Sequence, residues 1–345
     1  MNKLISRKKY IYPVEPMLDK YLREFSRSFL MPIGYQDLLR FHESIALYDE
    51  QGNDTLWSTV SYDARTRDII HDGLLGMYIF MRFDGDYSRS RDLLVDRVDL
   101  CLYGNTKPFR IRILNKLNDN FEYFYVKQAD ANRILGLELE HILSPNRIGF
   151  FCDKETLVEE HIYGIAGDVF VGRYLHNPDL NLVRLSKEFV KFNERCFIML
   201  LGDMHCANFV VNIIMDTEMD FYRIRAIDFD QQCYEPKLKV YLPQFFKQNK
   251  PYVDLVLGTL SGDSVLQYQH EERTLIHKRM VSSTYRLESL IRTMIDTKIS
   301  PIEHVQDLGG QLSKHYGNPM FASCQSMGAL LELSFREIER TRDFP

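Results

Sequence analysis

Apolar side chains in the first third of the chain recur at helical spacing. Between residues 16 and 29 they follow one another three or four positions apart, at Leu18, Leu22, Phe25 and Phe29. The segment 36–48 repeats this pattern, and the apolar run 73–83 fits either a helix or a buried strand. We therefore predict a mostly helical extension over residues 1–95. A scaffold role is the favoured interpretation, with substrate or partner binding as the alternative.

From residue 96 the pattern changes to the alternation of strands. Three short alternating runs are separated by turns rich in Gly, Asn and Asp, at 98–102, 109–114 and 121–127. They predict an antiparallel meander. The alanine-rich stretch 129–143 predicts a helix, and 148–161 predicts a hairpin.

The second half of the chain is mainly helical in pattern. Helices are predicted at 169–174, 186–200, 236–248, 271–297, 301–315 and 322–341. One hairpin interrupts them, with strands at 209–214 and 222–227 around a turn at 216–220. A small β-rich part with one helix, followed by a larger helical part, indicates an α+β protein.

Composition narrows the class of protein. A chain of 345 residues with 45% hydrophobic content is long enough for two lobes. The net charge of −5 disfavours a nucleic-acid partner, and we find no run near the roughly 18 apolar residues that a membrane span needs. Six cysteines without a Cys-x-x-Cys pair predict reduced thiols. We expect a cytoplasmic protein with neither nucleic acid nor membrane as its partner.

Polar side chains gather at the ends of the two strands of the second-half hairpin. Asp203 and Asn208 precede the first strand, and Asp228 and Asp230 follow the second. A hairpin brings these positions to one end, where their oxygens can converge. Mg²⁺ prefers such hard oxygen ligands, usually one or two carboxylates together with substrate phosphates. The alternative interpretation is that Asp203 and Asn208 only cap a turn.

These residues resemble a known catalytic signature. Gly-Asp203-x-His205-x-x-Asn208 followed by Ile-Asp228-Phe-Asp230 is similar to the motifs of aminoglycoside phosphotransferases and choline kinases, within the protein-kinase-like superfamily. The resemblance implies that Asp203 orients or deprotonates an acceptor hydroxyl and that His205 supports the catalytic loop. It also implies that Asn208, Asp228 and Asp230 bind Mg²⁺.

Upstream residues extend the resemblance to the ATP site. Lys127, at the end of a predicted strand, resembles the lysine that holds ATP phosphates. The following helix offers Glu138 and Glu140 as its partner. Because residues two apart cannot share a helical face, only one can pair, and we favour Glu138.

Two further segments match the family by position. Gly104 and Asn105 lie at the turn that covers the phosphates, although this turn has one glycine where protein kinases have three. Glu160 and Ile162 lie where backbone groups of a hinge contact adenine. On residue type alone, we interpret Glu159 and Glu160 as mostly surface charge.

The resemblance implies a bilobal protein-kinase-like fold. Its parts are an extension (1–95), a nucleotide-binding small lobe (96–164) and a catalytic helical lobe (165–345). The implied function is ATP- and Mg²⁺-dependent phosphoryl transfer to an unidentified hydroxyl-bearing substrate, a small molecule in preference to a protein. The alternatives are an inactive pseudokinase and a kinase-fold enzyme that transfers AMP.

A group of basic residues lies outside this motif. Five of them follow one another along a predicted helical region: Arg273, Lys278, Arg279, Arg286 and Arg292. We interpret them as a solvated helix face, with binding of an acidic or phosphorylated ligand as the alternative.

Overall fold

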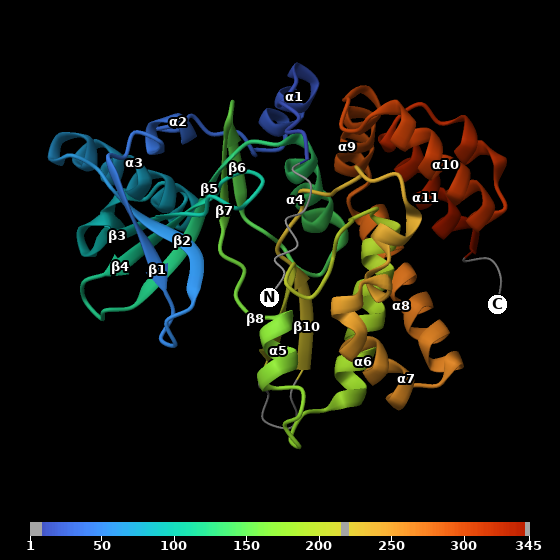
Figure 1. The fold of residues 1–345 in the computed structure, drawn as a ribbon. Helices are drawn as coiled ribbons and strands as arrows, with labels where there is room; N and C mark the ends of the chain where they lie inside the picture. The colour runs from blue at the N-terminus through green and yellow to red at the C-terminus, as the bar shows by residue number, and fades with distance from the viewer. Residues whose placement is uncertain (1–8, 215–220, 342–345) are drawn as a thin grey trace. The chain divides into compact units, whose positions relative to one another are not determined.

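The computed structural model describes residues 9–214 and 221–341, which divide into two compact units (Figure 1). The first contains the described part of Met1–Ala131 together with Ile148–His161, and the second contains Asn132–Arg147 together with the described part of Ile162–Pro345. The turn predicted at 216–220 lies outside the described residues. The functional boundaries after residues 95 and 164 stay predictions.

A seven-stranded antiparallel sheet forms the first unit, in the order β1-β2-β3-β4-β5-β7-β6 (Figure 1). Its strands are β1 (Glu43–Tyr48), β2 (Asp54–Ser61), β3 (Leu93–Leu100), β4 (Phe109–Asn115), β5 (Phe121–Gln128), β6 (Phe150–Asp153) and β7 (Thr156–Glu160). The predicted meander is confirmed, because β3, β4 and β5 pair as neighbours. The hairpin predicted over 148–161 is confirmed as β6 and β7.

One long helix covers a face of this sheet. The helical elements of the first unit are α1 (Pro16–Glu24), α2 (Tyr35–Leu38), α3 (Ala64–Phe83) and the 3-10 turn η1 (Tyr87–Asp92). Leu74 and Met77 of α3 share a buried core with Phe109, Ile111 and Phe124 of the sheet. Alternate strand residues therefore face α3, and the apolar run 73–83 is part of a helix.

The helical prediction for 36–48 is wrong. Only α2 is helical there, and β1 occupies the second half of the segment and pairs with β2. The turn between them is closed by Asp49, whose Oδ1 accepts from the backbone N–H groups of Gln51 and Asn53 at 2.9 and 2.8 Å. Because β2 also pairs with β3, residues 43–61 extend the sheet and are not a helical addition to it.

The second unit combines helices with a three-stranded sheet in the order β10-β9-β8. Its first elements are α4 (Ala131–Leu143, of which Ala131 belongs to the first unit), β8 (Ile165–Ala166), α5 (Gly167–Arg173), α6 (Leu182–Ile198), β9 (Phe209–Ile214) and β10 (Phe221–Ala226). The helices that follow are α7 (Lys250–Thr259), α8 (Gly262–Ser282), α9 (Thr284–Asp296), α10 (Ile302–Tyr316), η5 (Pro319–Ser323) and α11 (Met327–Thr341). Helix α6 packs against α7, α8 and β10.

The predicted helix 236–248 is also wrong. The segment consists of three short 3-10 turns, η2 (Leu238–Tyr241), η3 (Pro243–Phe245) and η4 (Lys247–Asn249). Pro243 explains the difference, because proline has no N–H to donate and clashes with the preceding turn of an α-helix. The regular helix begins only afterwards, as α7.

The α+β class is confirmed by this mixture of an antiparallel sheet and helices. All six cysteines are free thiols. Within the described residues, every helix is too short or too polar to cross a bilayer. The predicted cytoplasmic location stays a prediction.

Candidate functional site

A tight loop between α6 and β9 carries Asp203 and Asn208. The Asn208 Nδ2 donates to the backbone carbonyl of Asp203 at 2.8 Å, and the N–H of His205 donates to the same carbonyl at 2.9 Å. Asp203 has a left-handed backbone with a φ of 61°, a conformation that Asp tolerates better than most residues. The loop therefore holds the Asn208 amide by its nitrogen and leaves Oδ1 as its accepting atom.

The register of β9 and β10 brings Asp228 to the same end of the hairpin. Phe209 pairs with Ala226, and the N–H of Ile227 donates to the Asn208 carbonyl at 3.0 Å. Asp228 is the next residue. The structure thus brings Asp203, Asn208 and Asp228 to one end of the hairpin.

The electrostatic environment of Asp203 favours its protonated form. Burial raises the pKa of Asp203 to about 7, and the nearby charges of Asp228 and Glu235 act in the same direction. Two carboxylates that share one site repel each other, so protonation of one relieves the repulsion. A carboxyl with this pKa can accept a proton near neutral pH.

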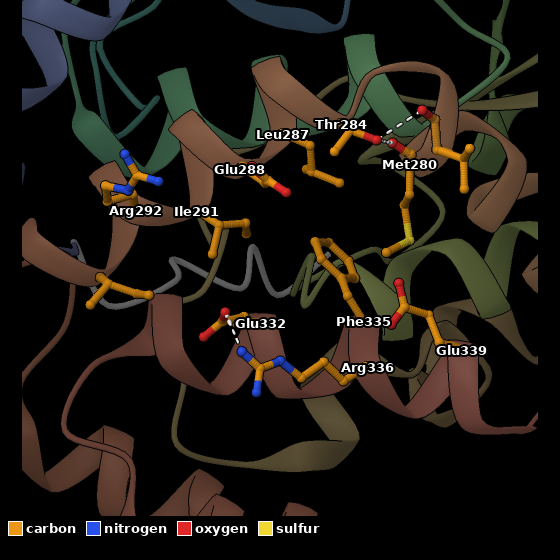
Figure 2. Close-up of a pocket in the computed structure, with 12 residues that line it drawn as sticks. Met280, Thr284, Leu287, Glu288, Ile291, Arg292, Glu332, Phe335, Arg336 and Glu339 are labelled. Carbon is orange, nitrogen blue, oxygen red and sulfur yellow. Dashed lines mark hydrogen bonds and ion pairs between the residues drawn. The ribbon is translucent and has the colours of Figure 1, made fainter.

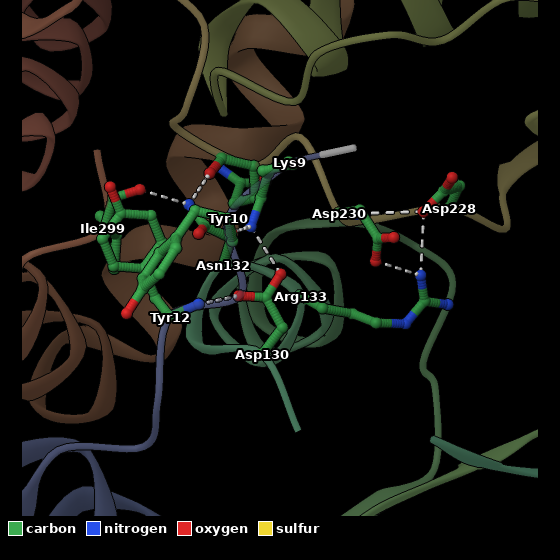
Figure 3. Close-up of polar contacts among 10 residues, drawn as sticks. Lys9, Tyr10, Tyr12, Asp130, Asn132, Arg133, Asp228, Asp230 and Ile299 are labelled. Carbon is green, nitrogen blue, oxygen red and sulfur yellow. Dashed lines mark hydrogen bonds and ion pairs between the residues drawn. The ribbon is translucent and has the colours of Figure 1, made fainter. Parts of the chain in front are cut away.

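A buried arginine lies between the two acids that follow β10 (Figure 3). The Arg133 Nη1 donates to Oδ1 of Asp228 and to Oδ1 of Asp230, each at 2.9 Å. Its Nη2 donates to the Ile227 carbonyl at 3.2 Å. The Arg133 side chain is 4% exposed, against 38% for Asp228 and 11% for Asp230. We call Arg133, Asp228 and Asp230 the acid cluster.

Sequence reasoning missed Arg133. The residue lies in the first turn of α4, and the helix packs on the segment after β10 through Gly136, where an added Cβ would lie 3.0 Å from the Phe229 Cβ. Asn132 fixes the same turn, because its Nδ2 donates to the Gln232 and Ile299 carbonyls at 2.7 and 2.9 Å. The available signal was an arginine at the start of a helical run whose next four residues carry no charge.

The acid cluster limits how a metal ion can bind. Arg133 already supplies positive charge to one oxygen of each carboxylate. Across residues 9–214 and 221–341, no group of three His, Cys, Asp or Glu side chains could hold a metal ion. Hard donors at this site include Oδ1 of Asn208 and the second oxygen of Asp228, a small set that suits Mg²⁺ completed by phosphate oxygens and water.

His205 has a structural environment in the loop. Its Nδ1 lies 3.3 Å from the Ala207 N–H that donates to it, and its ring lies edge-on to Phe246. Burial lowers its pKa, which favours neutral imidazole. These contacts fit the predicted supporting role.

Lys127 is held by a glutamate of the neighbouring strand. Its Nζ lies 2.8 Å from Oε2 of Glu159, and the two side chains are 9% and 5% exposed. The interpretation of Glu159 as surface charge is wrong, because β7 pairs with β5 and places Glu159 beside the lysine. Glu160 is half-buried at the end of β7, and its N–H donates to the Gly149 carbonyl at 2.9 Å. Ile162 is also half-buried.

The glutamates of α4 are both buried. Glu138 pairs with Arg286 at 2.5 Å, and Glu140 accepts from the Asn146 Nδ2 at 3.4 Å. Burial raises the pKa of Glu140. Pairing of Glu138 with Lys127 stays a prediction.

The turn after β3 contains Gly104 and Asn105. A Cβ at Gly104 would lie 2.7 Å from the Pro108 Cδ, so the close proline requires glycine there. The turn is closed by the Lys107 N–H, which donates to the Gly104 carbonyl at 3.1 Å. The Nδ2 of Asn105 is buried without a hydrogen-bond partner among the described residues. It is therefore a donor available to a ligand.

One groove in the second unit is lined by none of these residues. It has a volume of about 460 Å³ and runs between α9 and α11, with an apolar floor that includes Leu287, Ile291 and Phe335 (Figure 2). Its rim carries charges of both signs, among them Arg292 and Glu339. All its lining residues fall between 280 and 339, and none belongs to the predicted kinase-like site.

Comparison with known proteins identifies no relative by sequence. The chain matches neither a family model nor a curated protein. Among solved structures it is similar to "Titin kinase and its flanking domains", with 11% identity over 66% of this chain and a TM-score of 0.25. The match spans about half of that chain, 51%. A TM-score this low defines neither the fold nor the function of the chain.

Proposed function

We propose that the chain is a kinase-like phosphotransferase that moves a phosphoryl group from ATP to a hydroxyl. The observation that carries the proposal is the convergence of Asp203, Asn208 and Asp228 at the open end of the β9–β10 hairpin. Phosphoryl transfer needs mainly positioning and charge stabilisation, and these are what such oxygen-bearing groups supply.

Each residue has a distinct role in this proposal. Asp203 orients the acceptor hydroxyl and takes its proton, for which a pKa of about 7 is well matched to neutral pH. Asn208 Oδ1 and the second oxygen of Asp228 would hold Mg²⁺, which when bound neutralises phosphate charge. Lys127 has the phosphate-binding role that the sequence resemblance implies, and Glu159 fixes its ammonium group.

Turnover and nucleotide binding test these roles separately. The purified chain is incubated with Mg²⁺ and ATP labelled at the γ- or the α-phosphate, with water and a panel of hydroxyl compounds as acceptors. Asp203→Asn should lower turnover on the order of 10²–10⁴-fold and spare ATP binding. Asp228→Asn should remove the Mg²⁺-dependent part of ATP binding.

A matched control is Asp254→Asn, which removes an exposed carboxylate of α7 in the same unit. It should leave both measurements unchanged. Wild-type turnover in both site variants would refute the assignment. Transfer of the α-label instead of the γ-label would identify AMP transfer.

One observation favours a second candidate, a pseudokinase that binds nucleotide without turnover. Arg133 already places a cation on Asp228 and Asp230, the residues expected to bind metal. If this pairing persists when nucleotide binds, no metal is needed to neutralise the acids. ATP binding that is equal with Mg²⁺ and with a chelator, without any labelled product, would identify this function.

A further inference from the structure

A second charged cavity lies in the helical unit, and none of Asp203, Asn208 and Asp228 lines it. It has a volume of about 430 Å³ and is formed by the end of α4, the segment after it, the end of α8 and the start of α9. Among its described lining residues are three arginines and one histidine, with no Asp or Glu: Arg147, Arg279, Arg286 and His141. We call it the basic cavity.

Two of its arginines have no carboxylate partner. Within the described part of the chain, neither Arg147 nor Arg279 forms an ion pair with Asp or Glu. Arg279 donates from Nη1 to the Leu143 carbonyl at 3.1 Å, and Arg147 is exposed. Burial lowers the pKa of Arg279, and the nearby charges of Glu272 and Glu140 offset this only in part.

The carboxylates near this cavity already have other partners. Glu188 and Glu272 pair with Arg195 at 3.0 and 3.1 Å. Glu138 pairs with Arg286, the third arginine of the cavity, and Glu140 accepts from the Asn146 Nδ2 while burial raises the pKa of Glu140. An additional negative charge at Arg147 and Arg279 would therefore have to come from a ligand.

The start of α9 adds polar groups to the same cavity. Ser283, which precedes the helix, lines the cavity and makes no side-chain capping hydrogen bond. The 13-residue helix therefore begins beside the arginines without a side-chain cap from Ser283. The N–H groups at the start of a helix favour an anion, and arginine binds phosphate through two parallel hydrogen bonds.

We propose that the basic cavity binds a small phosphorylated molecule, with its phosphate held between Arg147, Arg279 and the start of α9. A dianionic phosphate matches two arginine charges that lack carboxylates. The cavity volume falls within the range of small-molecule pockets, about 300–1,000 Å³, so it has room for an organic group beside the phosphate. This binding site is separate from Asp203, Asn208 and Asp228, and it does not rest on the proposed phosphotransferase function.

Calorimetric titration of the full chain tests the proposal. The probes are inorganic phosphate and glycerol phosphate, in buffer without ATP or Mg²⁺ and at constant ionic strength. We expect saturable binding that Arg147→Gln and Arg279→Gln each weaken by at least about tenfold. The matched control is Lys278→Gln, which removes an equal charge from an exposed neighbour on α8 that does not line the cavity. It should change affinity by less than about twofold.

The outcomes separate the ligand source from the site itself. Tighter binding of glycerol phosphate identifies a phosphate ester as the ligand, and equal binding identifies free phosphate; both support the site. Absence of saturable binding, or equal weakening by the control, overturns it. If Arg279→Gln does not fold, the exposed Arg147 carries the same test. Asp228→Asn should leave phosphate binding intact, which keeps this result independent of the proposed function.

Discussion

The acid cluster and the basic cavity use arginine in opposite ways. In the acid cluster, the buried Arg133 is surrounded by acceptors, namely two carboxylates and a carbonyl. In the basic cavity, Arg147 and Arg279 have no carboxylate among the described residues. Helix α4 contributes to both, through Arg133 at its start and His141 near its end. The comparison teaches that an arginine's partners, more than its burial, distinguish a structural charge from one available to a ligand.

Among the changes that test this comparison, removal of Arg133 should have the largest effect on the stability of the fold. Arg133→Met keeps the volume of the side chain and leaves Asp228 and Asp230 without their cation. We expect the unfolding free energy to fall by about 3 kcal/mol. This is the lower end of the range for breaking a buried ion pair, because Asp228 is partly exposed. Urea unfolding measures the change. Millimolar Mg²⁺ should recover part of it, since a metal ion can replace the lost charge.

The control for this prediction is an exposed pair. Arg82 lies 2.6 Å from Glu122 with both side chains more than a third exposed, so Arg82→Met should cost less than about 1 kcal/mol. An equal loss in the two variants would show that Arg133 is not a special structural charge.

The second-largest effect is expected at Asp203, whose titration should change how the stability of the fold depends on pH. The folded state raises the pKa of this carboxyl from 3.8 to about 7, so the folded chain binds the proton more tightly than the unfolded chain. Stability contributed by this group is therefore present at low pH and is lost as pH rises through about 7.

Asp203→Asn removes this loss. Between pH 5 and pH 8, in metal-free buffer, the unfolding free energy of the variant should rise by about 2 kcal/mol relative to that of the wild type. This value is smaller than the full pKa shift corresponds to, because the side chain is partly exposed. Urea unfolding at both pH values checks the difference. Parallel pH profiles for the two proteins would contradict the raised pKa.

The smallest effect is expected at Arg147. Because its exposed side chain has no ion pair within the described residues, Arg147→Gln should change unfolding free energy by less than about 0.5 kcal/mol. Thermal unfolding in phosphate-free buffer gives the measurement. A loss comparable to that of Arg133→Met would assign Arg147 a structural role and remove the contrast between the two regions.

Much of the fold follows from local pattern. Strand β4 alternates between buried and half-buried positions over most of its length, and tight turns join it to β3 and β5, so their pairing could be predicted. The segment 43–48 could not, because β1 is almost wholly exposed and gains its strand conformation from pairing with β2. Pro243 argued against the helix predicted at 236–248, but the prediction gave more weight to the helical spacing of the apolar residues.

The contacts of the candidate site also divide into those that could be predicted from the sequence and those that could not. Asn208 and Asp228 adjoin the paired ends of one hairpin, so strand register brings them together, and the short loop before β9 adds Asp203. Arg133 is 95 residues from Asp228 in the chain, and Glu159 is 32 residues from Lys127. Both contacts depend on how distant elements pack, and a single sequence carries no local pattern for them.

The left-handed backbone at residue 203 decides which replacements are informative there. Asparagine and glycine accept a φ of 61° with little penalty, whereas alanine pays about 1 kcal/mol and a β-branched residue more. An alanine scan would thus mix loss of the carboxyl with a distorted loop and misplace the Asn208 amide, which hydrogen-bonds to the backbone of this residue. When residue 203 is changed to every other amino acid, two separate requirements should decide which replacements are tolerated. One is set by the backbone geometry and the other by the carboxyl group.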